Sequence, residues 1–191
     1  GLYLRNWGRN MKRSWAAFGI IFLVLMFLMP ISYGCRSDSH IDNGLKLVNR
    51  GYPELAIDEF SKAIEQDPEN VKAYHYRGNC YTDVGEYELA ANDYRKAMEL
   101  DIEYAPVFSS NCSLLLKTEE YDIALRNCDH AIELDPEMAE AYANRGNVHA
   151  KMENYDQAIE DLSKSIELHP SNARAYNDRG WVYNETGQYE L

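Results

Sequence analysis

The chain has 191 residues and a formal net charge of −12, and all 31 acidic residues lie after Cys35. The part beyond Cys35 therefore has a net charge of −16, and it contains no cluster of Lys or Arg. Because a phosphate backbone requires a basic surface, this composition excludes nucleic acid as an expected partner.

The first 35 residues have a pattern of their own. Residues 1–10 precede the first methionine, and we interpret them as read-through or disordered sequence. Residues 11–35 begin with two basic residues, continue with an uncharged apolar run and end with small residues just before Cys35. This order is typical of an export signal.

Three interpretations of residues 11–35 remain open. The segment resembles a bacterial lipoprotein signal, which implies a lipid on Cys35 after cleavage. It is also nearly long enough to be an uncleaved membrane anchor, or it is an ordinary secretory signal. In each case the basic start stays in the cytoplasm. The rest of the protein is therefore expected to be membrane-associated on the extracytoplasmic side, in a bacterial envelope or periplasm.

The remainder of the chain is a repeat. Ala56, Ala90, Ala124 and Ala158 stand 34 residues apart, and each opens a closely similar segment. Such a short unit buries its apolar face only by stacking on its neighbours. The predicted units are residues 37–70, 71–104, 105–138, 139–172 and 173–191, and the last of these is truncated before its second helix.

Each unit contains two apolar patterns with helical spacing, counted from its first residue as position 1. Positions 4, 8 and 11 form one face, and positions 20, 24 and 27 form another, both at i, i+4 and i+7. Small residues at positions 8 and 20 let two helices approach, while bulky residues at positions 4, 11 and 24 fill the surrounding space. Pro68, Pro136 and Pro170 at position 32 are expected to stop the second helix.

This pattern of aromatic, Gly, Tyr, Ala, aromatic, Ala and Pro resembles the tetratricopeptide repeat over residues 37–191. The resemblance implies an all-α, right-handed superhelical solenoid of antiparallel helix pairs, preceded here by the apolar signal or anchor helix. Ile102 replaces a proline, Cys112 replaces a glycine, and the first unit has His40 and Asn43 at less typical positions. These departures affect local packing.

Sequence motifs for catalysis are absent, and no spacing of Cys and His suits a metal, so we expect no enzyme, no cofactor and no small-molecule substrate. Cys112 and Cys128 face each other at positions 8 and 24 of the third unit. An oxidising compartment could bridge them, but the simpler interpretation is two small buried side chains. Arg77, Arg145 and Arg179 at position 7 are expected to form ion pairs inside their units, with Asp93 and Asp161 at position 23.

The resemblance also implies that first helices line a concave groove, with positions 2, 5, 9, 12 and 13 pointing into it. These positions vary between units while the core positions repeat, as expected if the groove carries specificity. The candidate partner-binding residues are His75, Asn79, Ser109, Ser113, Lys117, Asn147, Lys151, Asn177 and Trp181.

These side chains suit an extended peptide. The amides of Asn79 and Asn147 could hydrogen bond a peptide main chain, and Lys117 with Lys151 could attract an acidic side chain or a carboxylate. The sequence therefore predicts a non-catalytic, exported and membrane-tethered scaffold that binds a peptide or protein segment in its groove. The alternative is a self-associating or spacer array of a larger envelope protein.

Overall fold

The computed structural model describes residues 37–187, so the predictions made for residues 1–36, including the export segment and Cys35, lie outside the described part. Residues 37–187 form helices joined by short turns, and none of these helices is long and apolar enough to cross a membrane. A helix over residues 37–48 is followed by α2 (Pro53–Gln66), α3 (Val71–Val84), α4 (Tyr87–Leu100), α5 (Ala105–Lys117), α6 (Tyr121–Leu134), α7 (Ala139–Lys151), α8 (Tyr155–Leu168) and α9 (Ala173–Thr186).

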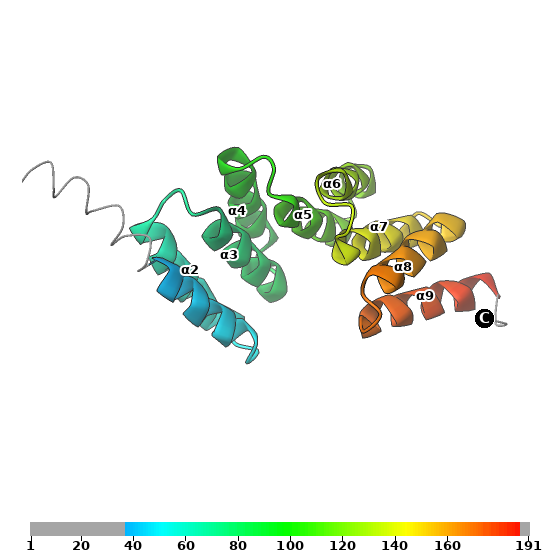
Figure 1. Ribbon diagram of the computed structural model, residues 1–191, viewed down its shortest axis with the longest axis horizontal. Helices are drawn as coiled ribbons and strands as arrows, with labels where there is room; N and C mark the ends of the chain where they lie inside the picture. The colour runs from blue at the N-terminus through cyan, green and yellow to red at the C-terminus, as the bar shows by residue number, and fades with distance from the viewer. Residues whose placement is uncertain (1–36, 188–191) are drawn as a thin grey trace, which may run out of the picture.

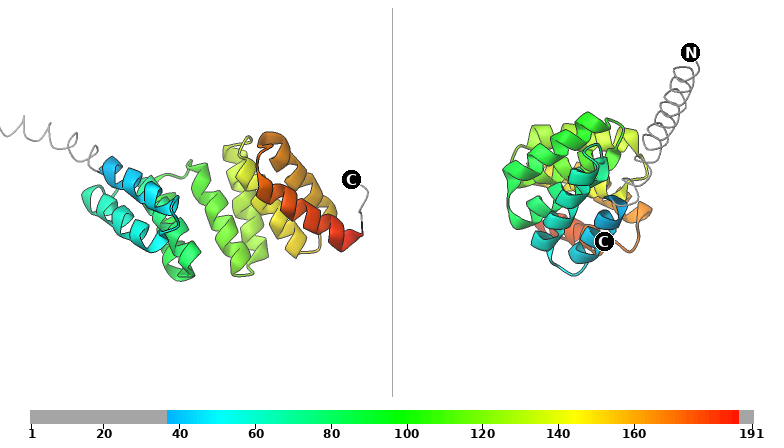
Figure 2. Two further views of the ribbon diagram at one scale, coloured as in Figure 1. Left: turned by 90° about the horizontal axis from the view of Figure 1, so that it is seen from below. Right: turned by 90° about the vertical axis from the view of Figure 1, so that its left-hand side faces the viewer.

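The helices stack in chain order as an extended, curved array (Figure 1). Helix α3 packs on α4, α5 on α6 and α7 on α8, and each pair also packs on the next. The view along the array shows that it curls, so that the first described helix and α9 lie on the same side (Figure 2). The prediction of an all-α stack of helix pairs is confirmed for the described residues.

The small residues at position 8 make the close helix contact possible. A Cβ on Gly78 would lie 2.6 Å from the Tyr94 ring, and one on Gly146 would lie 2.9 Å from Cγ of Leu162. Ala90, Tyr94, Ala158 and Leu162 are at most 1% exposed. Each glycine therefore provides the space that the bulky residue at position 24 of its own unit fills.

The third unit achieves the same contact with a covalent bond. Cys112 and Cys128 form a disulfide with a Cα–Cα distance of 5.5 Å, and both side chains are fully buried. The simpler interpretation of two separate small side chains was therefore wrong. Position 8 has no glycine here and position 24 has no bulky side chain, so two sulfurs fill the space between α5 and α6.

The arginines at position 7 pair as predicted in the second and fourth units. Nε and Nη2 of Arg77 donate to both carboxylate oxygens of Asp93, at 2.7 and 2.8 Å. Arg145 makes the same two bonds to Asp161, at 2.8 and 2.7 Å. In the third unit, Asn111 and Asn127 at these positions are joined by one amide hydrogen bond of 3.0 Å.

The second helices do not depend on proline to end. Helix α2 ends two residues before Pro68, and α4 ends at the equivalent Leu100 although Ile102 stands where the proline would be. In the connections at Asp67, Asp101 and Asp135, the aspartate side chain accepts a hydrogen bond from the backbone amide two residues later. This local turn is enough to stop the helix.

The turn inside each unit needs a left-handed residue at position 15. Gly51, Gly85 and Gly187 meet this need with φ between 71° and 84°, but Glu119 and Glu153 have φ of 64° and 62°. A residue with a Cβ pays about 1–2 kcal/mol for this conformation, while glycine loses more backbone entropy on folding.

We therefore expect Glu153→Gly to raise the free energy of unfolding by about 0.5–1 kcal/mol, because the relief of left-handed strain outweighs the entropy loss. Urea denaturation followed by circular dichroism measures this change. Glu160→Gly is the matched control, since it places glycine in the exposed middle of α8 and should destabilise by about 1 kcal/mol. A destabilised Glu153→Gly protein would contradict the expectation.

Candidate peptide-binding groove

The concave face contains two neighbouring hollows. The Trp181 hollow has a volume of about 350 Å³ and is lined by Leu116, Asn147, Ala150, Lys151, Arg174, Asn177, Asp178 and Trp181. The Lys117 hollow has a volume of about 320 Å³ and is lined by Val48, Asn79, Thr82, Asp83, Tyr94, Ser110, Ser113, Lys117, Glu140 and Arg174. Seven of the nine predicted groove residues line one hollow or the other.

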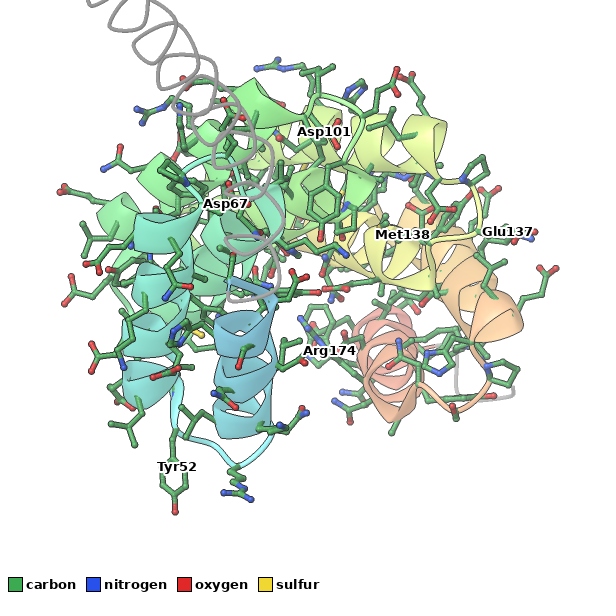
Figure 3. All side chains as sticks on the ribbon, turned by 60° about the vertical axis from the view of Figure 1, so that its left-hand side comes forward. Tyr52, Asp67, Asp101, Glu137, Met138 and Arg174 are labelled. Atoms are coloured by element: carbon green, nitrogen blue, oxygen red, sulfur yellow. A yellow bond between two sulfur atoms is a disulfide. The ribbon has the colours of Figure 1, made fainter. Side chains whose placement is uncertain are left out.

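Arg174 lines both hollows and joins them into one groove. It projects from α9 toward the first described helix (Figure 3), whose Val48 lines the same hollow. The curl of the array thus brings residues of the first and fifth units to a single surface. A ligand that fills both hollows would touch side chains from all five units.

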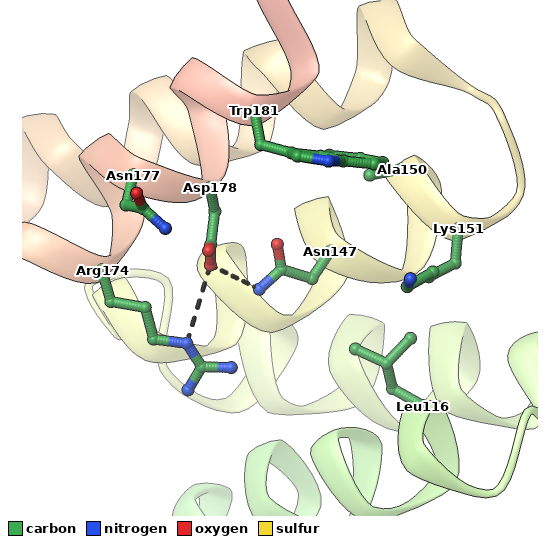
Figure 4. A pocket seen from close by; sticks show the side chains of 8 residues that line it. All are labelled: Leu116, Asn147, Ala150, Lys151, Arg174, Asn177, Asp178 and Trp181. Carbon is green, nitrogen blue, oxygen red and sulfur yellow. Dashed lines mark hydrogen bonds and ion pairs between the residues drawn. The ribbon is translucent and has the colours of Figure 1, made fainter. Parts of the chain in front are cut away.

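The Trp181 hollow combines an aromatic wall with charged edges (Figure 4). Trp181 is 44% exposed, and Lys151 Nζ lies 5.8 Å from the centre of its ring. Asp178 accepts a 2.8 Å hydrogen bond from Asn147 Nδ2 and lies 3.6 Å from Arg174 Nε. Such a site can hold an apolar side chain against the indole while the polar edges bind main-chain amides.

The Lys117 hollow is more polar. Tyr94 donates a 2.8 Å hydrogen bond from its hydroxyl to Asn79 Oδ1. Burial raises the pKa of Tyr94, so this hydroxyl remains neutral. Since Asn79 is already held by Tyr94 and by His75 at 3.3 Å, it positions the floor of the hollow. Of the three predicted groove residues in this hollow, Lys117 and Ser113 make no side-chain hydrogen bond within residues 37–187, so they are the better candidates for partner contacts.

Two predicted groove residues are not open to a partner. His75 is 5% exposed and Ser109 is 1% exposed. Nε2 of His75 lies 2.9 Å from Ser110 Oγ, and Ser109 Oγ accepts a 3.1 Å bond from Asn144 Nδ2. In both cases position 6 of the next unit covers position 5, so these side chains tie neighbouring units together. Asn177, at position 5 of α9, is exposed.

Four residues of the Trp181 hollow were not among the predicted groove residues. Arg174 stands at position 2, and Leu116 and Ala150 stand at position 12, which the family resemblance places in the groove, so their position was a usable signal. Asp178 stands at position 6, which is turned toward the preceding unit, and its bond to Asn147 had no sequence signal. The hollow therefore contains an acidic group where only basic and amide groups were expected.

Burial makes His75 harder to protonate than an ordinary histidine. Desolvation lowers its pKa from 6.5 to about 4, because its surroundings are the neutral groups of Tyr104, Ser110 and Asn79. The unfolded state therefore binds more protons than the folded state between pH 6.5 and 4, so stability is complete above pH 6.5 and is lost as the pH falls toward 4.

The low pKa of His75 is expected to reduce the free energy of unfolding by about 2 kcal/mol between pH 7 and pH 5. Between the same two pH values, the free energy of unfolding of His75→Gln should fall by about 2 kcal/mol less than that of the unsubstituted chain. His169→Gln, at an exposed position, is the control and should leave the pH dependence unchanged. Equal losses in the His75→Gln and unsubstituted proteins would contradict the assignment.

Residues 37–187 contain no group of three or more His, Cys, Asp or Glu side chains placed to hold a metal ion. The features that converge on the concave face are an exposed indole, cations, carboxylates and amides across an open surface. Together with the stack of helix pairs, they define a class of protein: an open helical-repeat scaffold for protein interaction.

Comparison with known proteins agrees with this class. Tetratricopeptide repeat profiles match residues 71–104 and 139–172, and a second profile of the same repeat matches residues 162–191. No curated protein sequence matches this chain. The chain belongs to the tetratricopeptide repeat family, whose members act as protein-interaction scaffolds.

Among solved structures, MamA is 30% identical with a TM-score of 0.61, over 75% of this chain and 84% of that one. The pilF protein of Pseudomonas aeruginosa is 26% identical with a TM-score of 0.73, over 83% of this chain and 72% of that one. YrrB, described as a TPR protein with an unusual peptide-binding site, is 26% identical with a TM-score of 0.56, over 79% and 78%.

Proposed function

We propose that this protein is an exported, membrane-tethered scaffold that binds a peptide or protein segment along the two hollows of its concave groove. The observation that carries this proposal is the Trp181 hollow. Its indole is 44% exposed and lines the same hollow as Lys151 and Arg174. Tryptophan side chains are usually mostly buried, and an exposed one is typical of a surface that binds a partner. The peptide-binding site named for the similar YrrB supports the same function.

The charges of the groove favour an extended segment with both apolar and acidic side chains. Lys117, Lys151 and Arg174 are distributed across the two hollows, whereas the chain as a whole is acidic. Asp83, Glu140 and Asp178 line the same hollows, so the groove as a whole is balanced in charge. In the Trp181 hollow two cations stand against one carboxylate, and this excess is complementary to an acidic side chain. The apolar part of such a segment would lie against Trp181.

Export has independent support in the described residues. The disulfide between Cys112 and Cys128 is buried in the third unit, and structural disulfides persist in oxidising compartments. Membrane attachment rests on the sequence of residues 11–35. The intact mass and the membrane fractionation of the protein expressed from Met11, with Cys35→Ala alongside, test this attachment. A mature protein that begins at an acylated Cys35, and that does not form in Cys35→Ala, supports a lipid anchor. An unprocessed, membrane-bound product from both supports an uncleaved anchor.

The groove is tested by affinity capture of partners from the producing cell with a variant in which four exposed groove side chains are replaced. We expect the amount of the main captured partner to fall at least tenfold, because the alanine substitutions remove the indole surface and three cations. The substitutions are Lys117→Ala, Lys151→Ala, Arg174→Ala and Trp181→Ala.

A matched control also loses three cations and one large apolar side chain, but from the second helices. It replaces Leu89, Arg95, Lys96 and Arg126 by alanine, and it should capture the partner normally. Circular dichroism confirms that both variants are folded. If the groove variant retains its partners, or the control loses them equally, the groove assignment is wrong.

A further inference from the structure

A separate hollow lies between the turns of the third and fourth units, and we call it the Ile123 cleft. It has a volume of about 340 Å³ and is lined by Glu119, Glu120, Tyr121, Asp122, Ile123 and Met152. It shares no lining residue with the Trp181 hollow or the Lys117 hollow. Both units that form it have their two helices in place, α5 with α6 and α7 with α8, so the cleft is a feature of the repeat array itself.

The floor of the Ile123 cleft is apolar. Ile123 lies in the first turn of α6 and is 40% exposed. It stands at position 19, next to the fully buried Ala124 that lies between the two helices. Tyr121 and Met152 pack on the core around the disulfide and complete the floor. The floor is thus an apolar surface that is open between two neighbouring units.

The fold does not require an apolar residue at position 19. Leu55 and Leu89 hold this position in the first and second units and are 54% and 45% exposed, while the fourth unit has Gln157 there. A polar side chain is therefore accepted, and it would avoid contact between apolar surface and water. Single exposed apolar residues are common on proteins, but Ile123 forms a hollow together with two further apolar side chains.

Three carboxylates surround this floor. Glu119, Glu120 and Asp122 are exposed, and none of them forms an ion pair within residues 37–187. Glu120 accepts a 3.0 Å hydrogen bond from Thr118 Oγ1. The two turns that meet at the cleft, residues 118–123 and 152–157, contain five carboxylates and no Lys or Arg. The negative charge around the floor is therefore not balanced by cations of the turns themselves.

Glu119 keeps its carboxylate at a cost to the backbone. Its φ is 64°, a conformation that Gly51 and Gly85 provide at the same position of the first two units. The left-handed conformation costs a residue with a Cβ about 1–2 kcal/mol. A binding contact made by this carboxylate would account for a glutamate at a position that suits glycine.

We propose that the Ile123 cleft is a docking site for a basic segment of a partner protein, in which Lys or Arg stands on both sides of a large apolar residue. The apolar residue would lie on the floor formed by Ile123 and Met152, and the flanking cations would face Glu119 and Asp122. Such charge complementarity favours this segment over an apolar segment that is neutral or acidic. The site is separate from the concave groove, so it does not depend on the function proposed above.

The charge of the cleft disfavours two other occupants. The part of the chain beyond Cys35 has a net charge of −16, so a second copy would bring like charges together. Anionic lipid headgroups attract basic rather than acidic surfaces, so a membrane is also a poor match. A basic segment matches both the apolar floor and the carboxylates around it.

The test uses a fluorescent peptide with the sequence Gly-Arg-Arg-Leu-Arg-Arg-Gly. Fluorescence anisotropy measures its binding to the 191-residue chain at low ionic strength, where contacts between exposed charges are least screened. We expect saturable binding that weakens at least fivefold when serine replaces the leucine of the peptide, because the apolar contact with the floor is lost.

Variants of the chain locate the peptide. Ile123→Gln should weaken binding at least fivefold, and its fold is kept because Gln157 holds the same position in the fourth unit. Glu119→Gln together with Asp122→Asn should weaken binding at least tenfold, since both partners of the cations are removed. Glu119→Gly should stabilise the fold by relieving the left-handed strain and still weaken binding, which separates a binding role from a structural one.

Two controls carry the same chemical changes elsewhere on the second helices. Leu55→Gln replaces the exposed apolar residue at position 19 of the first unit. Asp58→Asn with Glu65→Gln removes two exposed carboxylates from α2. Both controls should bind the peptide as the unsubstituted chain does.

Several outcomes would overturn the proposal. One is binding without saturation, and another is binding that is unchanged in both Ile123→Gln and the double carboxylate variant. Equal losses in the controls would show only a general attraction between a basic peptide and an acidic protein. A dimer in light scattering, or binding to lipid vesicles, that Ile123→Gln abolishes would place a second copy or a membrane in the cleft instead.

Discussion

Replacement of Cys112 and Cys128 together by alanine is expected to lower the free energy of unfolding by about 3 kcal/mol. The disulfide closes a loop with a sequence separation of 16 residues between α5 and α6, and a cross-link of this size removes about that much entropy from the unfolded chain. The loss is large because the third unit has neither the glycine nor the bulky residue that joins the helices in its neighbours. Urea denaturation under oxidising conditions measures it.

Reduction provides the control for this prediction. A reductant should destabilise the unsubstituted chain to nearly the level of the double alanine variant, and it should leave that variant unchanged. Cys80→Ala, which removes a buried free thiol in the second unit, should keep its sensitivity to the reductant. If the unsubstituted chain and the double variant unfold at the same urea concentration in both conditions, the disulfide contributes no stability.

A second large effect is expected from Arg77→Met, which should destabilise the protein by about 3 kcal/mol. Methionine keeps an apolar stem between Tyr74 and Tyr81, but it leaves Asp93, which is only 6% exposed, without its positive partner. Breaking a buried pair from one side is costly because a desolvated charge remains. Thermal and urea denaturation of the folded variant measure this cost.

The double variant Arg77→Met with Asp93→Leu separates the two explanations of that loss. If the cost comes from the stranded carboxylate, replacement of both partners by apolar residues should restore most of the stability. A double variant that is as unstable as Arg77→Met would instead show that the stability comes from the ion pair itself. The exposed pair of Lys96 and Glu99 on α4 is the control, and Lys96→Met should change stability by less than about 1 kcal/mol.

Much of the fold could be predicted from the sequence because the packing positions recur. The glycine at position 8, the alanine at position 20 and the bulky residue at position 24 meet in space as their helical spacing implies. The ion pairs of Arg77 and Arg145 followed from the same recurrence. Each of these contacts joins two helices of one unit, so the repeat itself supplies the evidence.

Features that belong to a single unit were harder to predict. The sequence could place Cys112 opposite Cys128, but only the structure shows them bridged, because the spacing also suits two small core residues. Glu119 and Glu153 adopt a left-handed conformation that their residue type disfavours. The third and fourth units thus keep the turn without its usual glycine.

The groove was predicted less completely because contacts between units decide which side chains are open. His75 and Ser109 share position 5 with Asn177, yet a residue at position 6 of the next unit covers each of the first two. Arg174 joins the two hollows only because the array curls back toward Val48. Helical spacing inside one unit carries no information about this curl.

The central claim is that the partner lies along the concave groove, and site-specific photo-crosslinking in the producing cell tests it most directly. A photoreactive amino acid at Ser113 or Asn177 samples the two hollows, and one at Lys96 or Lys164 samples the second helices. The proposal predicts that the same partner is crosslinked from Ser113 and Asn177 and not from Lys96 or Lys164. Crosslinks confined to Lys96 and Lys164 would contradict it.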